Sequence, residues 1–558
     1  MSIAWLKNNR VLLWRWLVLA LGIGVFLAVA LVGLRYGAGA DKWRIIGALP
    51  SPVRQAGKFF LHEWQDLPYL KYRFGDSGLP AYDLRIKPAD LAVLNSNIPA
   101  EGATVADITR TYVPVQIRYQ GKEYAGQMHW RGDSLNHWLY PKKSIRVRLN
   151  KNVLLGGKNI FNFIIPEDRL WVGEELNNYR ATKLGLLTPD SRFVVVTING
   201  QNQALYWEAE QIRSEFLERN GAAVGDVYGE LGLWDPFYTD INYWQKYIPN
   251  PNLPTTDWSD LAAILQLLNQ PSDQEFYRQV FALIDKETFY HYAVLNIIAG
   301  TSNQGGIHNM RWYFDPTIGK FRVLAWDIES NNFMYQGHDP YFLEETLNPL
   351  VKRILSNPSF TAERNEYLWQ YVKDPANLAD DLAYFDRQVK LIRKAVYQDR
   401  LRKRDDRVTD WEAQVSRLRP ALEKFFTRSR QFFVDFPALC VADQKGGKIA
   451  ITTRSLAPLS LERVDVLTAA STTAEVTLLS SESPLIAPVM TSQLLPTNVY
   501  ASSGGKDQDS LTAFFVGEAK REFSLRLPVP ARQPITQWSV RLKNNYTGAT
   551  AEVACKTF

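Results

Sequence analysis

The stretch that decides the fold is SNQGGIHNMRWYFDPTIGKFRVLAWDIESNNF, Ser302–Phe333. It reads as a polar loop, an apolar segment, a tight turn at Asp315–Gly319, a second apolar segment, and a loop of acids and amides. This order predicts a β-hairpin. Because strand pairing brings the outer ends of a hairpin together, Asn309 and Asp327 should lie close to each other. An amide oxygen beside a carboxylate suits a hard divalent cation, Mg²⁺ or Mn²⁺.

The same two residues also have a purely structural interpretation. An Asn before a strand and an Asp after one are commonly capping residues. Protein kinases, however, have a catalytic-loop Asn, a short hairpin and a metal-binding Asp in this order, and their metal ions contact the phosphates of ATP. The hairpin alone leaves both interpretations open.

A second segment, PKKSIRVRLN at residues 141–150, predicts a strand that begins with basic residues. Lys143 is an even number of residues away from the apolar residues of this strand. It should therefore face the core side with them and need an anionic partner. Glu210, which follows the predicted strand RFVVVTING, is the candidate partner. The structural alternative for Lys143 is a lysine whose stem lies along the core while its ammonium reaches the rim.

The loop RGDS precedes this strand and offers three kinds of phosphate-binding group. They are the side chain of Arg131, the backbone amides around Gly132 and the hydroxyl of Ser134. The RGD tripeptide also occurs in cell-adhesion motifs, but a match of three residues is too short to support that function. These groups make the loop suited to holding phosphate.

Together these segments resemble the CotH-like spore-coat protein kinases. Four segments occur here in the same order as in this family. They are YDLRIKPADLAVL, RGDS…YPKKSIRVRL, FNFIIPEDRLWVGEELNNYRATKLGLLTPDSRFVVVTINGQNQALYWEAEQI and HNMRWYFDPTIGKFRVLAWDIESNNF. The resemblance covers residues 79–335. It implies an atypical protein-kinase-like fold of the α/β (α+β) class that binds ATP and a divalent metal, and in bacterial members this fold phosphorylates partner proteins.

The resemblance also implies roles for individual residues. Arg131, Gly132, Ser134, Lys143 and Glu210 would bind the nucleotide, and Asn309 and Asp327 would bind Mg²⁺ or Mn²⁺. One position departs from the family pattern. The family has a catalytic Asp five residues before the metal-binding Asn, and here that residue is Gln304. A glutamine cannot accept a proton from a hydroxyl and at best orients the nucleophile.

His308 is the other candidate catalytic residue, since the pKa of histidine suits a general base. It lies next to Asn309 and not at the expected catalytic position, so a structural histidine is the alternative.

The sequence therefore leaves two candidate functions. One is an atypical kinase that transfers the ATP γ-phosphoryl group to a protein or envelope component; the other is an inactive pseudokinase that recognises a glycan or protein partner.

The 558 residues are too many for one ordinary core and predict several domains. The apolar run at 17–34 is long enough to span a bilayer, and Lys7, Arg10 and Arg15 precede it. We therefore expect a single-pass protein of the cell (inner) membrane with a cytoplasmic N-terminus and an extracytoplasmic body. A cleaved signal peptide is the alternative, because Ala38–Ala40 fits a cleavage site.

The expected divisions follow from changes of composition along the chain. The segment after Cys440 contains short β-type runs separated by Ser, Thr, Pro and Gly, which are typical of a β-sandwich and a further surface for glycan contact. Cys440 and Cys555 are the only cysteines and either form one disulfide or are two buried thiols. The net charge of +6 is small and gives no indication of nucleic-acid binding.

The expected divisions are a cytoplasmic N-terminus (1–16), a transmembrane anchor (17–34), a juxtamembrane stalk (35–78), the kinase-like domain (79–436) and an all-β sandwich-like domain (437–558).

Overall fold

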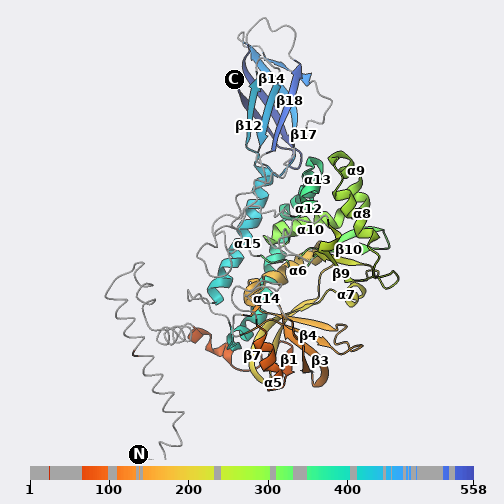
Figure 1. Cartoon of the computed structure of the whole chain (residues 1–558). Helices are drawn as coiled ribbons and strands as arrows, with labels where there is room; N and C mark the ends of the chain where they lie inside the picture. The colour runs from red at the N-terminus through yellow and green to blue at the C-terminus, as the bar shows by residue number, and fades with distance from the viewer. Residues whose placement is uncertain are drawn as a thin grey trace, which may run out of the picture.

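The computed structural model describes Gly24 and the residues 66–98, 110–132, 137–138, 142–230, 240–301, 304, 309–330, 348–402, 411–443, 448–453, 455–468, 473–475, 477–478, 485–486, 519–526 and 535–557. Figure 1 shows them as an elongated molecule with three parts: a β-barrel, a helical part with a small sheet, and a β-region that carries the C-terminus. The long helix α15 (Trp411–Val434) leads from the helical part to the β-region.

Seven strands form a closed barrel with the order β1-β2-β3-β4-β5-β7-β6. Neighbouring strands are antiparallel, except that β1 and β6 pair in parallel and so close the barrel. In β2 every second residue is buried, which is the pattern that an alternating sequence such as VPVQIRY dictates. The strands are β1 (Ala81–Arg85), β2 (Val113–Tyr119), β3 (Lys122–Trp130), β4 (Ile145–Leu149), β5 (Ile160–Ile164), β6 (Ser191–Ile198) and β7 (Gln201–Glu210).

The barrel has its own apolar core, and helical elements of different lengths pack around it. Inside, the rings of Tyr82 and Tyr119 stack with their centroids 4.4 Å apart. On the outside, Tyr69 of η1 stacks on Tyr397 of α14 at 4.7 Å, which joins the first described segment to the longest helices. The surrounding elements are η1 (Leu67–Arg73), α5 (Pro88–Ser96), η4 (Pro166–Arg169), α6 (Gly173–Lys183) and α14 (Pro375–Gln398).

The predicted hairpin is confirmed and belongs to a four-stranded sheet with the order β11-β10-β8-β9. Its turn forms because the Asp315 carboxylate accepts hydrogen bonds from the backbone N–H and the hydroxyl of Thr317, at 3.0 and 2.6 Å. Gly319 then takes the left-handed conformation, with φ of 64°. The elements here are α7 (Ser214–Arg219), β8 (Val227–Glu230), η5 (Ile241–Tyr243), β9 (Trp244–Ile248), β10 (Arg311–Asp315) and β11 (Lys320–Leu324).

Helices cover this sheet, and the most buried of them is α10 (Lys286–Ala299). Its N-cap Asp285 accepts a hydrogen bond from the backbone N–H of Thr288 at 3.0 Å, and Gly300 ends it in the left-handed conformation. The chain therefore leaves α10 directly into the loop that contains Gln304. The other helices are α8 (Ser259–Leu268), α9 (Asp273–Leu283), α12 (Pro349–Leu355) and α13 (Pro358–Lys373).

Among its described residues, the C-terminal region has nine strands joined in one sheet. A disulfide links Cys440 of β12 to Cys555 of β20, two strands that lie side by side in parallel. Contacts with the helical part include a hydrogen bond of 2.7 Å from the Asn544 side chain to the carbonyl of Phe433. The strands are β12 (Ala438–Asp443), β13 (Lys448–Thr453), β14 (Leu459–Thr468), β15 (Thr473–Glu475), β16 (Thr477–Leu478), β17 (Leu485–Ile486), β18 (Ala519–Arg526), β19 (Ile535–Asn544) and β20 (Thr550–Thr557).

The mixed α/β class is confirmed by these helices and sheets, whereas the predicted membrane anchor is not supported. Within the described ranges, every helix is too short or too polar to cross a bilayer. This finding corrects the expectation of a single-pass inner-membrane protein with an extracytoplasmic body. The run at 17–34 on which that expectation rested lies outside the described residues, apart from Gly24.

Candidate functional site

The hairpin brings Asn309 and Asp327 to the same end of the small sheet. Arg311, the first residue of β10, pairs with Leu324, the last residue of β11, so Asn309 and Asp327 lie just beyond the paired ends. Asn309 is buried, and Asp327 takes a left-handed backbone conformation with φ of 56°. That conformation is uncommon for a residue with a side chain, although Asp is among those that tolerate it. Asn309 and Asp327 therefore both lie at the open end of the hairpin.

Gln304 lies beneath this end and is held by three hydrogen bonds. Its amide oxygen accepts from the hydroxyl of Tyr292 at 2.7 Å. Its amide nitrogen donates to the carbonyls of Trp326 at 3.1 Å and Asp327 at 2.9 Å. The residue is only 5% exposed. Gln304 therefore joins the middle of α10 to the backbone of Trp326 and Asp327, and both polar groups of its side chain are engaged within the protein.

Arg169 is the most highly connected cation of the site. It ends η4 and is 4% exposed. Its Nη2 lies 2.9 Å from an oxygen of Asp327, its Nε lies 3.1 Å from an oxygen of Glu174, and Nη1 contacts Glu329. Burial alone would lower the pKa of Arg169, but Asp327 and Glu174 outweigh it, and the pKa is raised. Three carboxylates thus surround one buried guanidinium.

Glu174 connects this cluster to the RGDS loop. It lies in the first turn of α6, and burial raises its pKa to about 7, although Arg169 and Arg131 act in the opposite direction. Arg131 is held by its backbone, whose N–H donates to the carbonyl of Ser144 at 2.8 Å. Arg131 and Asp327, which are far apart in the sequence, therefore influence the same carboxyl group.

Gly132 continues this loop with a backbone that only glycine adopts easily. Its φ is 124°, and a Cβ at this position would lie 2.1 Å from the ring of His137. The ring of His137 is hydrogen-bonded to Ser144 at 3.0 Å. Ser134, which was predicted to bind phosphate, lies outside the described residues, as does His308.

The two adjacent lysines before β4 have different surroundings. Lys142 is fully buried, and its Nζ lies 2.6 Å from Asp399 and 2.8 Å from Glu167. Lys143 is half-buried, and burial lowers its pKa. The core lysine is therefore Lys142, because β4 begins only at Ile145 and the alternation of the strand does not extend back to Lys143.

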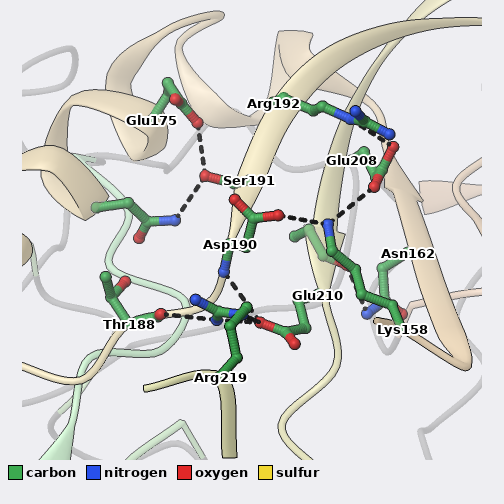
Figure 2. A network of polar contacts seen from close by, with 12 residues as sticks. Lys158, Asn162, Glu175, Thr188, Asp190, Ser191, Arg192, Glu208, Glu210 and Arg219 are labelled. Atoms are coloured by element: carbon green, nitrogen blue, oxygen red, sulfur yellow. Dashed lines mark hydrogen bonds and ion pairs between the residues drawn. The ribbon is translucent and has the colours of Figure 1, made fainter. Parts of the chain in front are cut away.

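Glu210 has Arg219 as its ionic partner, not Lys143. Figure 2 shows the guanidinium of Arg219 against the Glu210 carboxylate, which also accepts from the backbone N–H of Asp190 at 3.1 Å. The predicted pairing of Glu210 with Lys143 is corrected by this geometry. The reason is local: α7 begins four residues after Glu210 and carries Arg219 back toward β7.

A neighbouring network contains a different Lys–Glu pair. Lys158 lies 3.1 Å from Glu208 and 2.6 Å from Asp190, and Arg192 lies 3.1 Å from the same Glu208 (Figure 2). Glu208 also accepts a hydrogen bond from the hydroxyl of Tyr82 at 2.9 Å inside the barrel. These contacts fix the end of the barrel next to the small sheet. They are fully engaged with one another and point to a structural role.

The residues present do not fit a divalent metal at Asp327. Across the part of the chain that the structure describes, no group of three or more His, Cys, Asp or Glu side chains is arranged to hold a metal ion. The Asp327 carboxylate has the guanidinium of Arg169 beside it instead. Arg169, Glu174 and Lys142 were not recognised in the sequence. For Arg169 and Glu174 the signal was the dense charge of PEDRLWVGEE, which by itself predicts a solvated turn.

Comparisons with known proteins agree with the sequence motifs. The family model described as "CotH kinase protein" matches residues 128–425. The Inner spore coat protein H of Bacillus subtilis (strain 168) is 22% identical over 307 residues, which cover 51% of this chain and 78% of that protein. Among solved structures, the Helicobacter pylori proinflammatory kinase CtkA matches 52% of this chain and 93% of its own, with 9% identity and a TM-score of 0.22. A structural likeness at that score does not assign a fold.

Proposed function

The chain belongs to the CotH kinase protein family, and we propose that it acts as a kinase-like binding protein that has lost phosphoryl transfer. The proposal retains the kinase-like fold implied by the family. It assigns the chain the recognition of a partner protein or glycan instead of catalysis.

The observation that carries this proposal is the environment of Gln304. In the family pattern this position holds the carboxylate that accepts the proton of the acceptor hydroxyl. Here the side chain is a buried amide whose oxygen and nitrogen are both engaged. Turning it toward a substrate would leave two backbone carbonyls and a tyrosine hydroxyl without their partner, which costs about 1–3 kcal/mol for each buried group. Gln304 is thus neither a base nor an available orienting group.

The proposed ligand site contains the buried Arg131 and the half-buried Lys143. Both are basic, and the lowered pKa of Lys143 reflects the cost of keeping a half-buried charge away from water. Because both side chains are cationic, an acidic segment of a protein or an acidic glycan is the ligand chemistry we propose. The metal-binding role predicted for Asn309 and Asp327 has no part in this function.

The experiment is a phosphoryl-transfer assay on the full chain with labelled ATP and Mg²⁺ or Mn²⁺. The chain itself and a generic basic protein serve as acceptors, and an active protein kinase is the positive control. The matched control is Asp327→Asn, which removes the one carboxylate that any kinase mechanism on this hairpin requires. We expect the wild-type chain and the variant to give the same background signal. Metal-dependent transfer that disappears in the variant would overturn the proposal.

The second candidate is the kinase itself, which transfers the ATP γ-phosphoryl group to a protein or envelope component. The observation that favours it is the convergence of Arg131 and Asp327 on Glu174, because it joins the predicted phosphate-binding loop to the hairpin. ATP would then contact Arg131, Gly132 and Lys143. This candidate requires Arg169 to leave Asp327 before Asn309 and Asp327 can hold Mg²⁺ or Mn²⁺. The same transfer assay separates the two candidates.

A further inference from the structure

The guanidinium of Arg169 lies beside the Asp327 carboxylate, where a metal-dependent site would bind its cation. Its three guanidinium nitrogens face three different carboxylates, those of Asp327, Glu174 and Glu329. These acids come from two separate places: Asp327 and Glu329 lie in the loop after β11, and Glu174 lies in the first turn of α6. A convergence of this kind usually neutralises a bound divalent ion. Here the protein supplies the positive charge itself.

We propose that Arg169 replaces a divalent cation at Asp327, so that the native site is charge-balanced by a resident guanidinium and excludes Mg²⁺ and Mn²⁺. This inference concerns the charge of the site and not its catalysis. It goes beyond the proposed function, and either can fail while the other stands, because metal binding is measured without nucleotide and without an acceptor.

The position of Arg169 is fixed by the turn that carries it. In η4 the carbonyl of Pro166 accepts a hydrogen bond from the backbone N–H of Trp171 at 2.7 Å. Glu167 of the same turn is anchored by the buried ammonium of Lys142 at 2.8 Å. Arg169 is therefore attached to a short, rigid turn and is itself buried. Moving the Arg169 side chain out of the site would therefore cost more free energy than moving an exposed arginine.

The position of Asp327 is fixed from the other side. Gln304 donates a hydrogen bond to its carbonyl, and the hairpin register sets where the chain leaves β11. A Mg²⁺ ion needs oxygen ligands at about 2.0–2.1 Å. The Nη2 atom of Arg169 is 2.9 Å from the Asp327 oxygen, so an ion bound there would be in contact with a like charge. Metal and guanidinium therefore exclude each other.

The test is Mn²⁺ binding to the full chain, measured by electron paramagnetic resonance with no nucleotide present. We expect the wild-type chain to show no Mn²⁺ binding that depends on Asp327, so that Asp327→Asn leaves its titration unchanged. Arg169→Gln should bind Mn²⁺ about tenfold or more tightly than the wild type, and the double variant Arg169→Gln/Asp327→Asn should lose this gain. Arg169→Lys is the matched control, because it keeps a cation at the site and should show no gain.

Two results would overturn the inference. One is Mn²⁺ binding to the wild-type chain that is lost in Asp327→Asn. The other is a folded Arg169→Gln protein, checked by circular dichroism, that binds no more Mn²⁺ than Arg169→Lys. If Arg169→Gln does not fold, the comparison of the wild type with Asp327→Asn still decides, since both retain the arginine. If the wild type and Asp327→Asn give the same Mn²⁺ titration, the result supports Arg169 as the cation of this site.

Discussion

The ammonium of Lys142 lies 2.6 Å from the carboxylate of Asp399, although the two residues are 257 positions apart in the sequence. The same ammonium lies 2.8 Å from Glu167 and donates to the carbonyl of Leu205 at 3.0 Å. Burial disfavours the charge on Lys142, but Asp399 and Glu167 outweigh it and raise its pKa. A single buried cation thus connects the barrel, η4 and the C-terminal end of α14.

We predict that Lys142→Met lowers the free energy of unfolding by about 3–5 kcal/mol, because it leaves two buried carboxylates without their cation. Lys143→Met is the matched control: the same change one residue away, at a half-buried position, should cost less than about 1 kcal/mol. Urea unfolding followed by tryptophan fluorescence measures both. Equal losses for the two variants would contradict the assignment of Lys142 as the core lysine.

These two lysines also show how far the sequence could predict the site. Alternation within β4 correctly places its apolar residues inward. The pattern fails at Lys143, because residues before the first strand pair no longer follow the pleat. The sequence could not predict the partner of Lys142 for a different reason. Asp399 lies beyond α14, and no local pattern connects it with β4.

Gln304 leads to a prediction that separates a structural from a catalytic role. Gln304→Glu keeps the shape of the side chain but removes the two N–H donors that hold the carbonyls of Trp326 and Asp327. We expect a loss of about 1–3 kcal/mol in unfolding free energy near neutral pH, because the new carboxylate faces two carbonyl oxygens. The loss should shrink at acidic pH, because the introduced carboxyl group is then protonated and can donate a hydrogen bond to one of the carbonyls. Chemical denaturation at both pH values measures it.

The control for this variant is Tyr292→Phe, which removes only the hydroxyl that donates to the Gln304 oxygen. Its loss should be smaller and independent of pH in the same range. Gln304→Glu should also give no phosphoryl transfer above the Asp327→Asn background. A variant that is as stable as the wild type and gains transfer would instead identify position 304 as part of a working catalytic loop.

The parts of the fold that the sequence predicted are local ones. The hairpin follows from two apolar segments around a turn in which Asp315 accepts from Thr317, and its register is set by that turn. Closure of the barrel depends on the parallel pairing of β1 with β6, which are more than a hundred residues apart and carry no sequence signal for each other. Arg169 was missed for the same reason: its three carboxylates are gathered by tertiary structure.

The disulfide provides a prediction for the C-terminal sheet. Cys440 and Cys555 join neighbouring strands across a sequence separation of 115 residues. In the chain-entropy model, closing a loop of this length stabilises the folded state by roughly 4–5 kcal/mol. We expect Cys440→Ala/Cys555→Ala to lower the thermal stability of this region, and limited proteolysis should then cut first within residues 437–558. Identical cleavage of the double variant and the oxidised wild type would contradict this expectation.

The last prediction concerns His129 in β3, which is 1% exposed. Its Nδ1–H donates to the carbonyl of Trp130 at 2.7 Å, and the ring of Tyr112 packs against it with centroids 4.4 Å apart. The charged groups that act most strongly on it are cationic: Arg146 from β4, with Arg110 and Arg131. Burial, reinforced by these arginines, lowers the pKa of His129 to about 4.

A lowered histidine pKa makes stability fall with acid. Well above pH 6.5 His129 is neutral in both the folded and the unfolded chain, and it adds no pH dependence. Between pH 6.5 and about 4 the unfolded chain binds a proton that the folded chain does not, so the free energy of unfolding decreases by about 3 kcal/mol in total.

The matched variant is His129→Gln, which keeps a donor for the Trp130 carbonyl and does not titrate. Urea unfolding of both proteins at about pH 7.5, 6, 5 and 4 should therefore give curves that converge toward acidic pH, with the variant losing less stability. Carboxylates that titrate over the same range contribute equally to both curves and cancel in the difference. Parallel curves would mean that the folded protein accommodates a charged imidazole at this position, and the three arginines would then have to lie farther from the ring than the structure has them.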